Sequence, residues 1–189
     1  MFRLSSIQGK MTAAIILTIA LIVAALGFTL NGVRGISEGF DNYLSVNQPR
    51  VAALNTMYGK GLLAGVATRN KVFNPSLTAP EGVIRESGVQ FLQALEFYRS
   101  SSKSLAPELQ KSLELIQENW EVTQKARVEV YGLATQGRMR EASDLLARTE
   151  QPAWNFIRVA LDKLLDSEKN FTHASQLSMQ QQVTQTYFG

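Results

Sequence analysis

An uncharged apolar run near the N-terminus, Met11–Leu30, is the feature that most constrains the fold of this chain. A helix needs roughly 20 mainly apolar residues to cross a membrane, and this run provides them. Arg3 and Lys10 precede it, and basic flanking residues mark the cytoplasmic side of a membrane helix. A cleaved signal peptide has a shorter apolar core of about 7–15 residues and a small-residue cleavage site, which Ala24–Gly27 matches poorly. We therefore expect an uncleaved transmembrane anchor.

The anchor divides the chain into three expected parts. Residues 1–10 stay in the cytoplasm, residues 11–30 cross the membrane, and residues 31–189 form an extracytoplasmic domain. That remainder has the size of one ordinary domain. The absence of cysteine suits an oxidising compartment outside the cytoplasm.

The composition argues against an enzyme. Without cysteine and with a single histidine, His173, the chain offers no thiol nucleophile and no Cys/His zinc site. It also lacks the glycine-rich phosphate-binding motifs GxxxxGK[ST] and GxGxxG. We expect no catalytic residue, no metal and no cofactor. The 19 basic and 16 acidic residues are too balanced to indicate a nucleic-acid partner.

Helical periodicity predicts an all-α domain. Apolar or small residues recur every three or four positions between Asn31 and Phe73, so the membrane helix should continue as a long first helix, bent at Pro49. Asn74-Pro75 should end it, because the residue before proline resists the α conformation. The predicted core stripe comprises Val51, Leu54, Tyr58, Gly61, Gly65, Thr68 and Val72, widened by Leu62, Val66 and Phe73.

Thr78-x-x-Glu81 has the pattern of a capping box and should open a second helix, from about Pro80 to Ser102. Its predicted core face is Val83, Val89, Leu92, Leu95 and Phe97. A third helix should run from Pro107 to a stop at Gly137, with Trp120 among its core residues.

The last segment runs from Arg138 to about Val183. Pro152 either kinks it or starts a new helix after a short one over Arg138–Thr149. Trp154 begins the apolar stripe of this segment. Four helices with three short connections predict an up-down-up-down four-helix bundle that grows out of the anchor.

Three local patterns add to this layout. They are the string from Pro49 to Tyr58, then Gly65–Asn70 with Asn74-Pro75, and Gly137-x-x-x-Glu141-Ala142 before a Leu-rich run. Together they resemble the sensory region of bacterial methyl-accepting chemotaxis receptors. The resemblance implies a homodimer in the inner membrane, whose periplasmic bundle binds a small solute and passes a helix displacement across the membrane. Members of the family continue into a second membrane helix and cytoplasmic signalling modules, so we expect the sensory part of a longer receptor or a truncated gene product.

In this family ligand sits near the distal tip, where the first helices of two subunits meet and arginines hold carboxylates. Arg69 best matches such a position, about one turn before the tip. An arginine on an apolar stripe needs a partner, and a bidentate anion fits its geometry. We expect a small anionic ligand, an amino acid, organic acid or inorganic anion, with hydrogen bonds from Thr68 and Asn70.

Other interpretations remain open at this stage. Arg69 could instead pair with Glu141 or Glu81 and only brace the tip. The spacing of Gly61 and Gly65 indicates either a homodimer seam or packing within the bundle. Arg50, after a proline, is expected at the solvated surface. The bundle could also serve a histidine kinase or a cyclase, or be a membrane-anchored scaffold that binds a protein partner.

Overall fold

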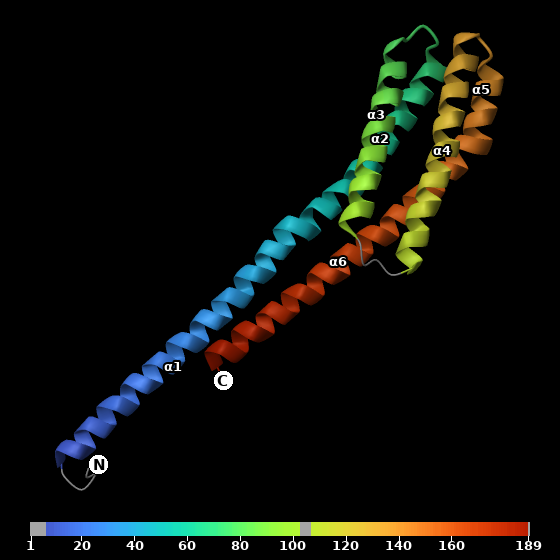
Figure 1. The fold of residues 1–189 in the computed structure, drawn as a ribbon. Coiled ribbons are helices and arrows are strands. Elements are labelled where there is room, and N and C mark those ends of the chain that lie inside the picture. The colour runs from blue at the N-terminus through green and yellow to red at the C-terminus, as the bar shows by residue number, and fades with distance from the viewer. Residues whose placement is uncertain (1–6, 103–106, 189) are drawn as a thin grey trace. The chain divides into compact units, whose positions relative to one another are not determined.

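The fold is all-α, as the periodicity predicts. The computed structural model describes residues 7–102 and 107–188, and in this part of the chain helices are joined only by short connections (Figure 1). Two of the elements are single π-helical turns, which are designated η. The elements are α1 (Ile7–Asn42), η1 (Tyr43–Asn47), α2 (Gln48–Phe73), α3 (Ala79–Ser101), α4 (Pro107–Thr135), α5 (Met139–Leu145), η2 (Leu146–Glu150) and α6 (Gln151–Phe188).

The chain divides into two compact units, Met1–Leu44 with Thr172–Gly189, and Ser45–Phe171. In the first unit, α1 carries large apolar side chains that are exposed along its length. Helical conformation is continuous from Gly9 to Phe73, and this is the one helix in the described part of the chain that is long and apolar enough to cross a membrane. Its length and composition therefore agree with a membrane-spanning role.

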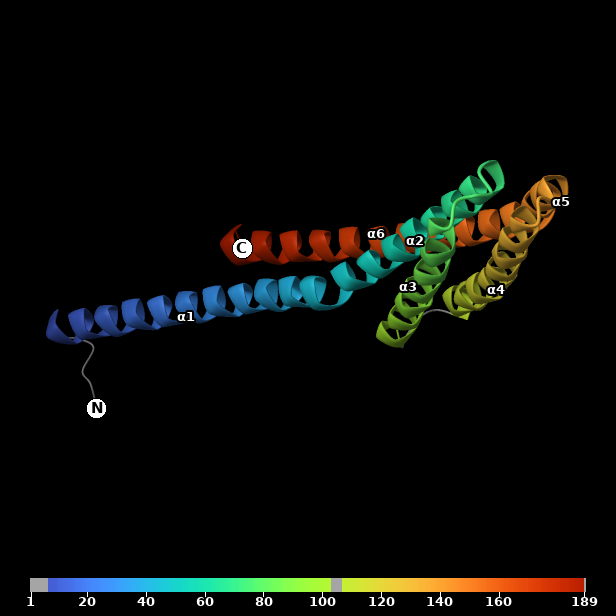
Figure 2. The ribbon, with the colours of Figure 1, turned by 90° about the horizontal axis from the view of Figure 1, so that it is seen from above.

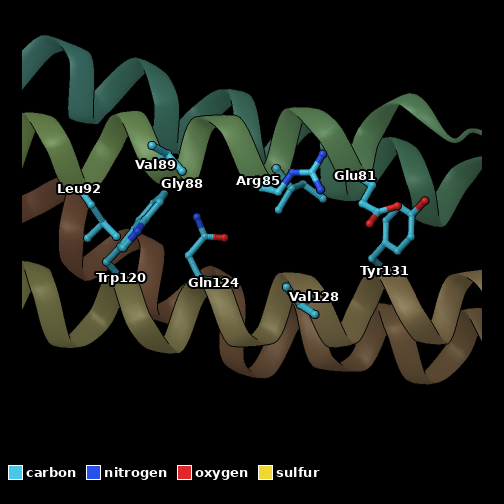
Figure 3. Close-up of a pocket in the computed structure, with 10 residues that line it drawn as sticks. Glu81, Arg85, Gly88, Val89, Leu92, Trp120, Gln124, Val128 and Tyr131 are labelled. Atoms are coloured by element: carbon cyan, nitrogen blue, oxygen red, sulfur yellow. The ribbon is translucent and has the colours of Figure 1, made fainter.

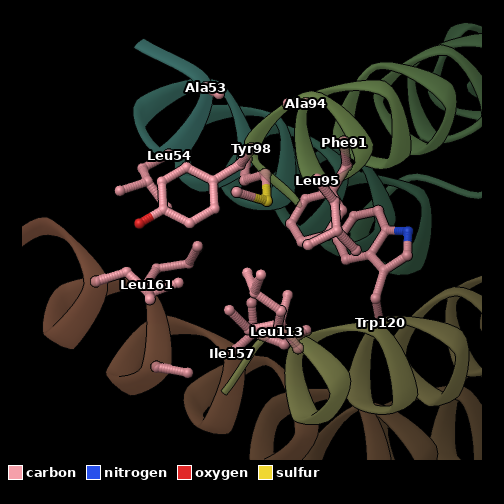
Figure 4. Packing of buried hydrophobic residues seen from close by; sticks show 14 of the residues in the cluster. Ala53, Leu54, Phe91, Ala94, Leu95, Tyr98, Leu113, Trp120, Ile157 and Leu161 are labelled. Atoms are coloured by element: carbon pink, nitrogen blue, oxygen red, sulfur yellow. The ribbon is translucent and has the colours of Figure 1, made fainter. Parts of the chain in front are cut away.

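The second unit encloses the main apolar core. In Figure 1, α2 and α3 form one helical hairpin and α4 and α5 another, and Figure 2 shows the α2–α3 hairpin from above. Side chains from α2, α3, α4 and α6 meet between them (Figure 4). The fully buried members of this core include Leu54, Met57, Phe91, Tyr98, Ile116, Ile157, Leu161 and Leu164.

Two predicted helix ends are confirmed. α2 ends at Phe73, directly before Asn74-Pro75. α4 ends two residues before Gly137, whose φ of 77° lies in the left-handed region that favours glycine. Hydrogen bonds from the amides of Gly137 and Arg138 to the carbonyls of Ala134 and Leu133 then close the last turn. The predicted connection over residues 100–107 falls partly outside the described residues.

The predicted capping box is wrong, although α3 begins where it was expected. Thr78 has α-helical backbone angles (φ −100°, ψ −30°), and its side chain makes no capping hydrogen bond. An N-cap side chain reaches the helix amides from an extended backbone, which Thr78 does not have. The Glu81 amide instead donates to the backbone carbonyl of Thr78.

The predicted core face of α3 is also wrong in part. Val89, Leu92 and Phe97 are exposed, and of the five predicted core residues only Leu95 is fully inside. α3 has apolar residues on more than one side, so hydropathy alone does not select the buried stripe. The side that faces the bundle carries small residues, which let neighbouring helices approach closely. It comprises Ile84, Ser87, Gly88, Phe91, Ala94, Leu95 and Tyr98.

Each π-helical turn is followed by one glutamine and then a proline. η1 ends at Asn47 before Gln48-Pro49, and η2 ends at Glu150 before Gln151-Pro152. Proline cannot donate the helical hydrogen bond and its ring crowds the preceding turn, so an extra residue in that turn lets the helix continue. Pro152 therefore lies in the first turn of α6. The short helix predicted before it is α5, which ends at Leu145 and not at Thr149. Both π turns end in a buried polar residue.

Gly61 and Gly65 pack against side chains within the bundle, which is the second of the two interpretations that their spacing left open. A Cβ at Gly61 would lie 2.1 Å from ring atoms of Trp154, so α2 and α6 approach closely there. A Cβ at Gly65 would lie 2.9 Å from Nη1 of Arg69 and 3.2 Å from Nη2 of Arg127. Both glycines are buried by neighbours from the same chain.

We predict opposite effects for two alanine substitutions on α2. Gly61→Ala drives a methyl group into the Trp154 ring, and the free energy of unfolding should fall by about 1–3 kcal/mol. Gly59→Ala is the matched control, because a Cβ there meets nothing within 4 Å. It should raise stability by up to about 1 kcal/mol through helix propensity. Denaturant unfolding followed by circular dichroism measures both, and equal responses would contradict the close packing at Gly61.

Candidate functional site

Arg127 is a fully buried charge in the second unit. It lies on α4 with 0% of its surface exposed, in a stripe otherwise made of core residues. Its guanidinium carbon lies 5.3 Å from the Trp120 ring centroid and 5.7 Å from that of Trp154. Both contacts are within the range of cation–π attraction. An arginine in this position needs a buried anion, because an unpaired charge in the core is costly.

Glu150, at the end of η2, supplies that anion. Its Oε1 accepts hydrogen bonds from Nε and Nη2 of Arg127, at 2.9 and 2.7 Å. Nη2 also donates to the carbonyl of Gly61 at 3.0 Å, whereas Nη1 of Arg127 has no acceptor among the described residues. Burial lowers the pKa of Arg127, and the carboxylate of Glu150 opposes that shift. The pair ties α4, η2 and α2 together.

Arg69 completes this cluster from the solvent side. Its side chain is 41% exposed, and its Nη2 lies 3.4 Å from Oε2 of Glu150. The separation is long for a charge-assisted hydrogen bond, so Arg69 holds Glu150 less strongly than Arg127 does. Two guanidinium groups share one carboxylate, and the cluster of Arg69, Arg127 and Glu150 carries an excess positive charge.

The predicted site residues occupy different environments. Thr68 is fully buried, and its hydroxyl donates to the carbonyl of Ala64 at 2.8 Å. Asn70 is exposed, and its carbonyl accepts the amide of Asn74 at the helix end. The structure thus brings Arg69 and Asn70 to the surface of α2 and turns Thr68 inward.

The acidic partners proposed for Arg69 are wrong. Glu141 pairs at the surface with Arg138, three residues earlier, and this pairing lowers the pKa of Glu141 and raises that of Arg138. Glu81 lies on α3, in the lining of a groove described below. Arg69 meets Glu150 instead, because the π turn η2 carries that carboxylate toward α2.

Sequence reasoning missed Arg127 and Glu150, although a signal for both exists. Arg127 is seven residues after Trp120 and three before Val130, so it interrupts an apolar stripe as Arg69 does. Glu150 stands four residues before Trp154, at the start of the apolar stripe of α6. A charge at a core position requires a partner, and the two residues satisfy each other.

A second buried cluster joins α2, α3 and α6. Arg50 forms an ion pair with Glu168, and Tyr98 donates to the same carboxylate oxygen at 2.7 Å. The guanidinium carbon of Arg50 also lies 5.3 Å from the Tyr98 ring centroid. Burial and the neighbouring carboxylate raise the pKa of Tyr98, so its hydroxyl stays protonated. The expectation that Arg50 is solvated is wrong, because Glu168 pairs with it inside the bundle.

Lys71 closes the end of the α2–α3 hairpin. Its ammonium group donates to the carbonyls of Pro75 and Leu77 in the connection, and it lies 4.6 Å from the Tyr131 ring centroid. The side chain is buried although it is charged. These contacts satisfy carbonyls that the turn leaves without helical partners. No group of three or more possible metal ligands occurs in the described part of the chain.

A groove of about 400 Å³ lies between α3 and α4 (Figure 3). Most of its lining is apolar, and polar side chains stand at its middle and at one end. The lining residues are Glu81, Ile84, Arg85, Gly88, Val89 and Leu92 from α3, and Trp120, Gln124, Val128 and Tyr131 from α4. Trp120 thus borders both this groove and the guanidinium of Arg127.

We predict that Glu150→Gln destabilises the bundle strongly. The substitution leaves Arg127 buried without its counter-ion, which should cost about 3–5 kcal/mol of unfolding free energy. Glu141→Gln is the matched control, because its ion pair is exposed and should contribute little to stability. The double variant Arg127→Met, Glu150→Leu should recover most of the loss, since it removes both charges together. Chemical denaturation measures the free energy of unfolding of all three variants. If Glu150→Gln leaves that free energy unchanged, the assigned pairing is wrong.

The second unit thus holds a charged cluster of Arg69, Arg127 and Glu150, and a groove between α3 and α4. No protein-family model, no curated protein and no solved structure matches the chain.

Proposed function

We propose that this chain is the sensory region of a membrane-anchored bacterial receptor, of the kind that the chemotaxis receptors represent. In this proposal α1 crosses the inner membrane, with residues 1–10 in the cytoplasm. The helices that follow form an up-down-up-down bundle in the periplasm, which binds a small anion. The chain is a binding module, not an enzyme. Two findings support the proposal: the apolar helix α1 is long enough to span a membrane, and the second unit is an all-helical body with its own core.

The observation that carries the proposal is the charge imbalance beside Arg69. Glu150 neutralises only one of two guanidinium groups, and Arg127 already holds it with two short hydrogen bonds. Arg69 keeps a partly exposed fork of donors, which suits a carboxylate or another planar or tetrahedral oxyanion. Asn70, the next residue, adds an exposed amide. Thr68 is buried and shapes this part of α2, so the geometry supports Arg69 and Asn70 more than Thr68 as contacts.

The proposed signal starts at η2. An anion on Arg69 competes with Glu150 for that guanidinium, and Glu150 belongs to a π turn that continues directly into α6. A π turn and an α turn differ in hydrogen-bond register, so a change there shifts the helix that follows. The ligand favours one helix position only in so far as it binds that position more tightly. In this mechanism α6 carries the displacement toward the membrane.

We also propose a homodimer, formed along the outer face of α2. Leu62, Val66 and Phe73 lie at helical spacing on that face and are exposed, Phe73 with 86% of its surface. Single exposed apolar residues are common, but a stripe along one helix is typical of a helix-pairing surface. Pairing through this face would bring Arg69 of two subunits near a shared interface. Gly61 and Gly65 take no part, because they are buried within the subunit.

We predict that Arg69→Gln abolishes binding of the anion. The full chain in lipid nanodiscs is screened by thermal unfolding against amino acids, organic acids and inorganic anions. A ligand at a hundredfold excess over its Kd should stabilise the protein by about 2.7 kcal/mol. Arg140→Gln, at an exposed arginine on α5, is the control and should retain the effect. If every hit survives in Arg69→Gln, the proposed anion site at Arg69 is wrong, and a screen without hits would contradict direct sensing.

A second prediction concerns the dimer. Val66→Glu places a charge on the exposed stripe of α2 and should turn a dimer into a monomer in analytical ultracentrifugation of the full chain. Val159→Glu is the control, because Val159 is equally exposed, at 50% against 51%, but lies on α6. A wild-type chain that sediments as a monomer, or a dimer that both substitutions leave intact, would contradict pairing through α2.

A further inference from the structure

The groove between α3 and α4 has the size and lining of a small-molecule site. Its volume of about 400 Å³ falls within the range of pockets that hold small ligands. Val89, Leu92 and Val128 line it and are exposed, at 52, 47 and 66%. A bound apolar group would remove their surface from water, which supplies a driving force for binding. None of these residues belongs to the cluster around Arg69.

Two hydrogen-bond donors at the groove are buried without acceptors. Nε1 of Trp120 and Nε2 of Gln124 make no hydrogen bond to any described residue, and Trp120 is only 1% exposed. The two side chains are one helical turn apart on α4 and line the same wall. In Figure 4 the indole nitrogen lies on the ring edge turned away from the labelled core residues. An unmade hydrogen bond of a buried donor is costly, so these donors select a ligand with an acceptor.

The opposite wall lets the Gln124 amide lie close to α3 and adds a positive charge. Gly88 has no side chain, and a Cβ there would lie 2.6 Å from Nε2 of Gln124. Figure 3 shows the head group of Gln124 in the space between the α3 and α4 ribbons, and that of Arg85 over the α3 ribbon. Arg85 forms no ion pair with any described residue, although Glu81 lines the groove one turn away. Donors of Trp120, Gln124 and Arg85 therefore favour a carboxylate over a cation.

We infer that the α3–α4 groove binds a small carboxylate with an apolar, ring-sized body, at a site separate from Arg69. The ring lies against Val89, Leu92 and Val128, and the carboxylate accepts from Gln124 and Trp120 and faces Arg85. This site goes beyond the proposed sensory function, but its ligand would contact a residue that packs against the ion cluster. Trp120 stacks on Phe91 with ring centroids 3.6 Å apart, and its ring also lies against the guanidinium of Arg127. A ligand that binds Trp120 would therefore contact a direct neighbour of the ion cluster.

The experiment uses the full chain in nanodiscs and phenylacetate as the probe. Acetate lacks the ring, and phenethylamine keeps the ring but carries a positive charge. Nuclear magnetic resonance follows the indole N–H signals of the two tryptophans, with Trp154→Phe assigning that of Trp120. Phenylacetate should shift the Trp120 signal in a saturable way, whereas acetate and phenethylamine should leave it in place. An unmoved Trp120 signal, or an equal response to phenethylamine, would overturn the inference.

Two groove variants and two controls locate the site. Gln124→Leu removes one donor and should raise the Kd for phenylacetate about tenfold, whereas Gln93→Leu, at an exposed position of α3, should not. Val128→Phe fills the groove from an exposed position and should abolish binding. Arg69→Gln should leave phenylacetate binding unchanged. If Arg69→Gln removes binding and Gln124→Leu does not, the probe sits at the ion cluster and the groove assignment is wrong.

Discussion

The buried pair of Arg127 and Glu150 is the interaction on which the second unit depends. It joins α4 to η2, which continues directly into α6, and through the carbonyl of Gly61 it reaches α2. An apolar pair would stabilise the same contact at least as well, because burying two charges costs free energy that their attraction only repays with good geometry. The charges instead fix which residues meet. They set the register of three helices at one point, and Trp120 and Trp154 pack around that point.

The second cluster plays the corresponding part further along the bundle. Glu168 lies eighteen residues after Glu150 on the same helical segment, and it is held by Arg50 from α2 and Tyr98 from α3. The apolar stripe of α6 runs between the two glutamates. The Glu168 end of that stripe is thus pinned to α2 by Arg50, and the Glu150 end to α4 by Arg127, whose guanidinium also bonds the Gly61 carbonyl of α2. The arrangement restrains sliding of α6 along α2, and any displacement of α6 has to break or stretch one of these contacts.

The features that the sequence predicts well are those decided by nearby residues. Asn74-Pro75 and Gly137 end helices because of their own backbone preferences, and both ends lie where expected. The face of α3 was less predictable, because apolar residues occur on several of its sides and the choice depends on the partner helices. The partner of Arg69 was not predictable at all, since Glu150 is 81 positions away and reaches it only through the π turn. Arg127 is the residue that the periodicity already marks, as a charge at a core position.

The π turn η2 also gives its segment a tolerance for a change in length. A π turn holds one residue more than an α turn, so deleting one residue between Leu146 and Glu150 would leave an ordinary α turn. The apolar faces of α5 and α6 would then keep nearly their present orientation, and Trp154, Ile157 and Leu161 would stay in the core. Such a deletion acts first on the ion pair of Glu150 with Arg127, because Glu150 is the last residue of the turn.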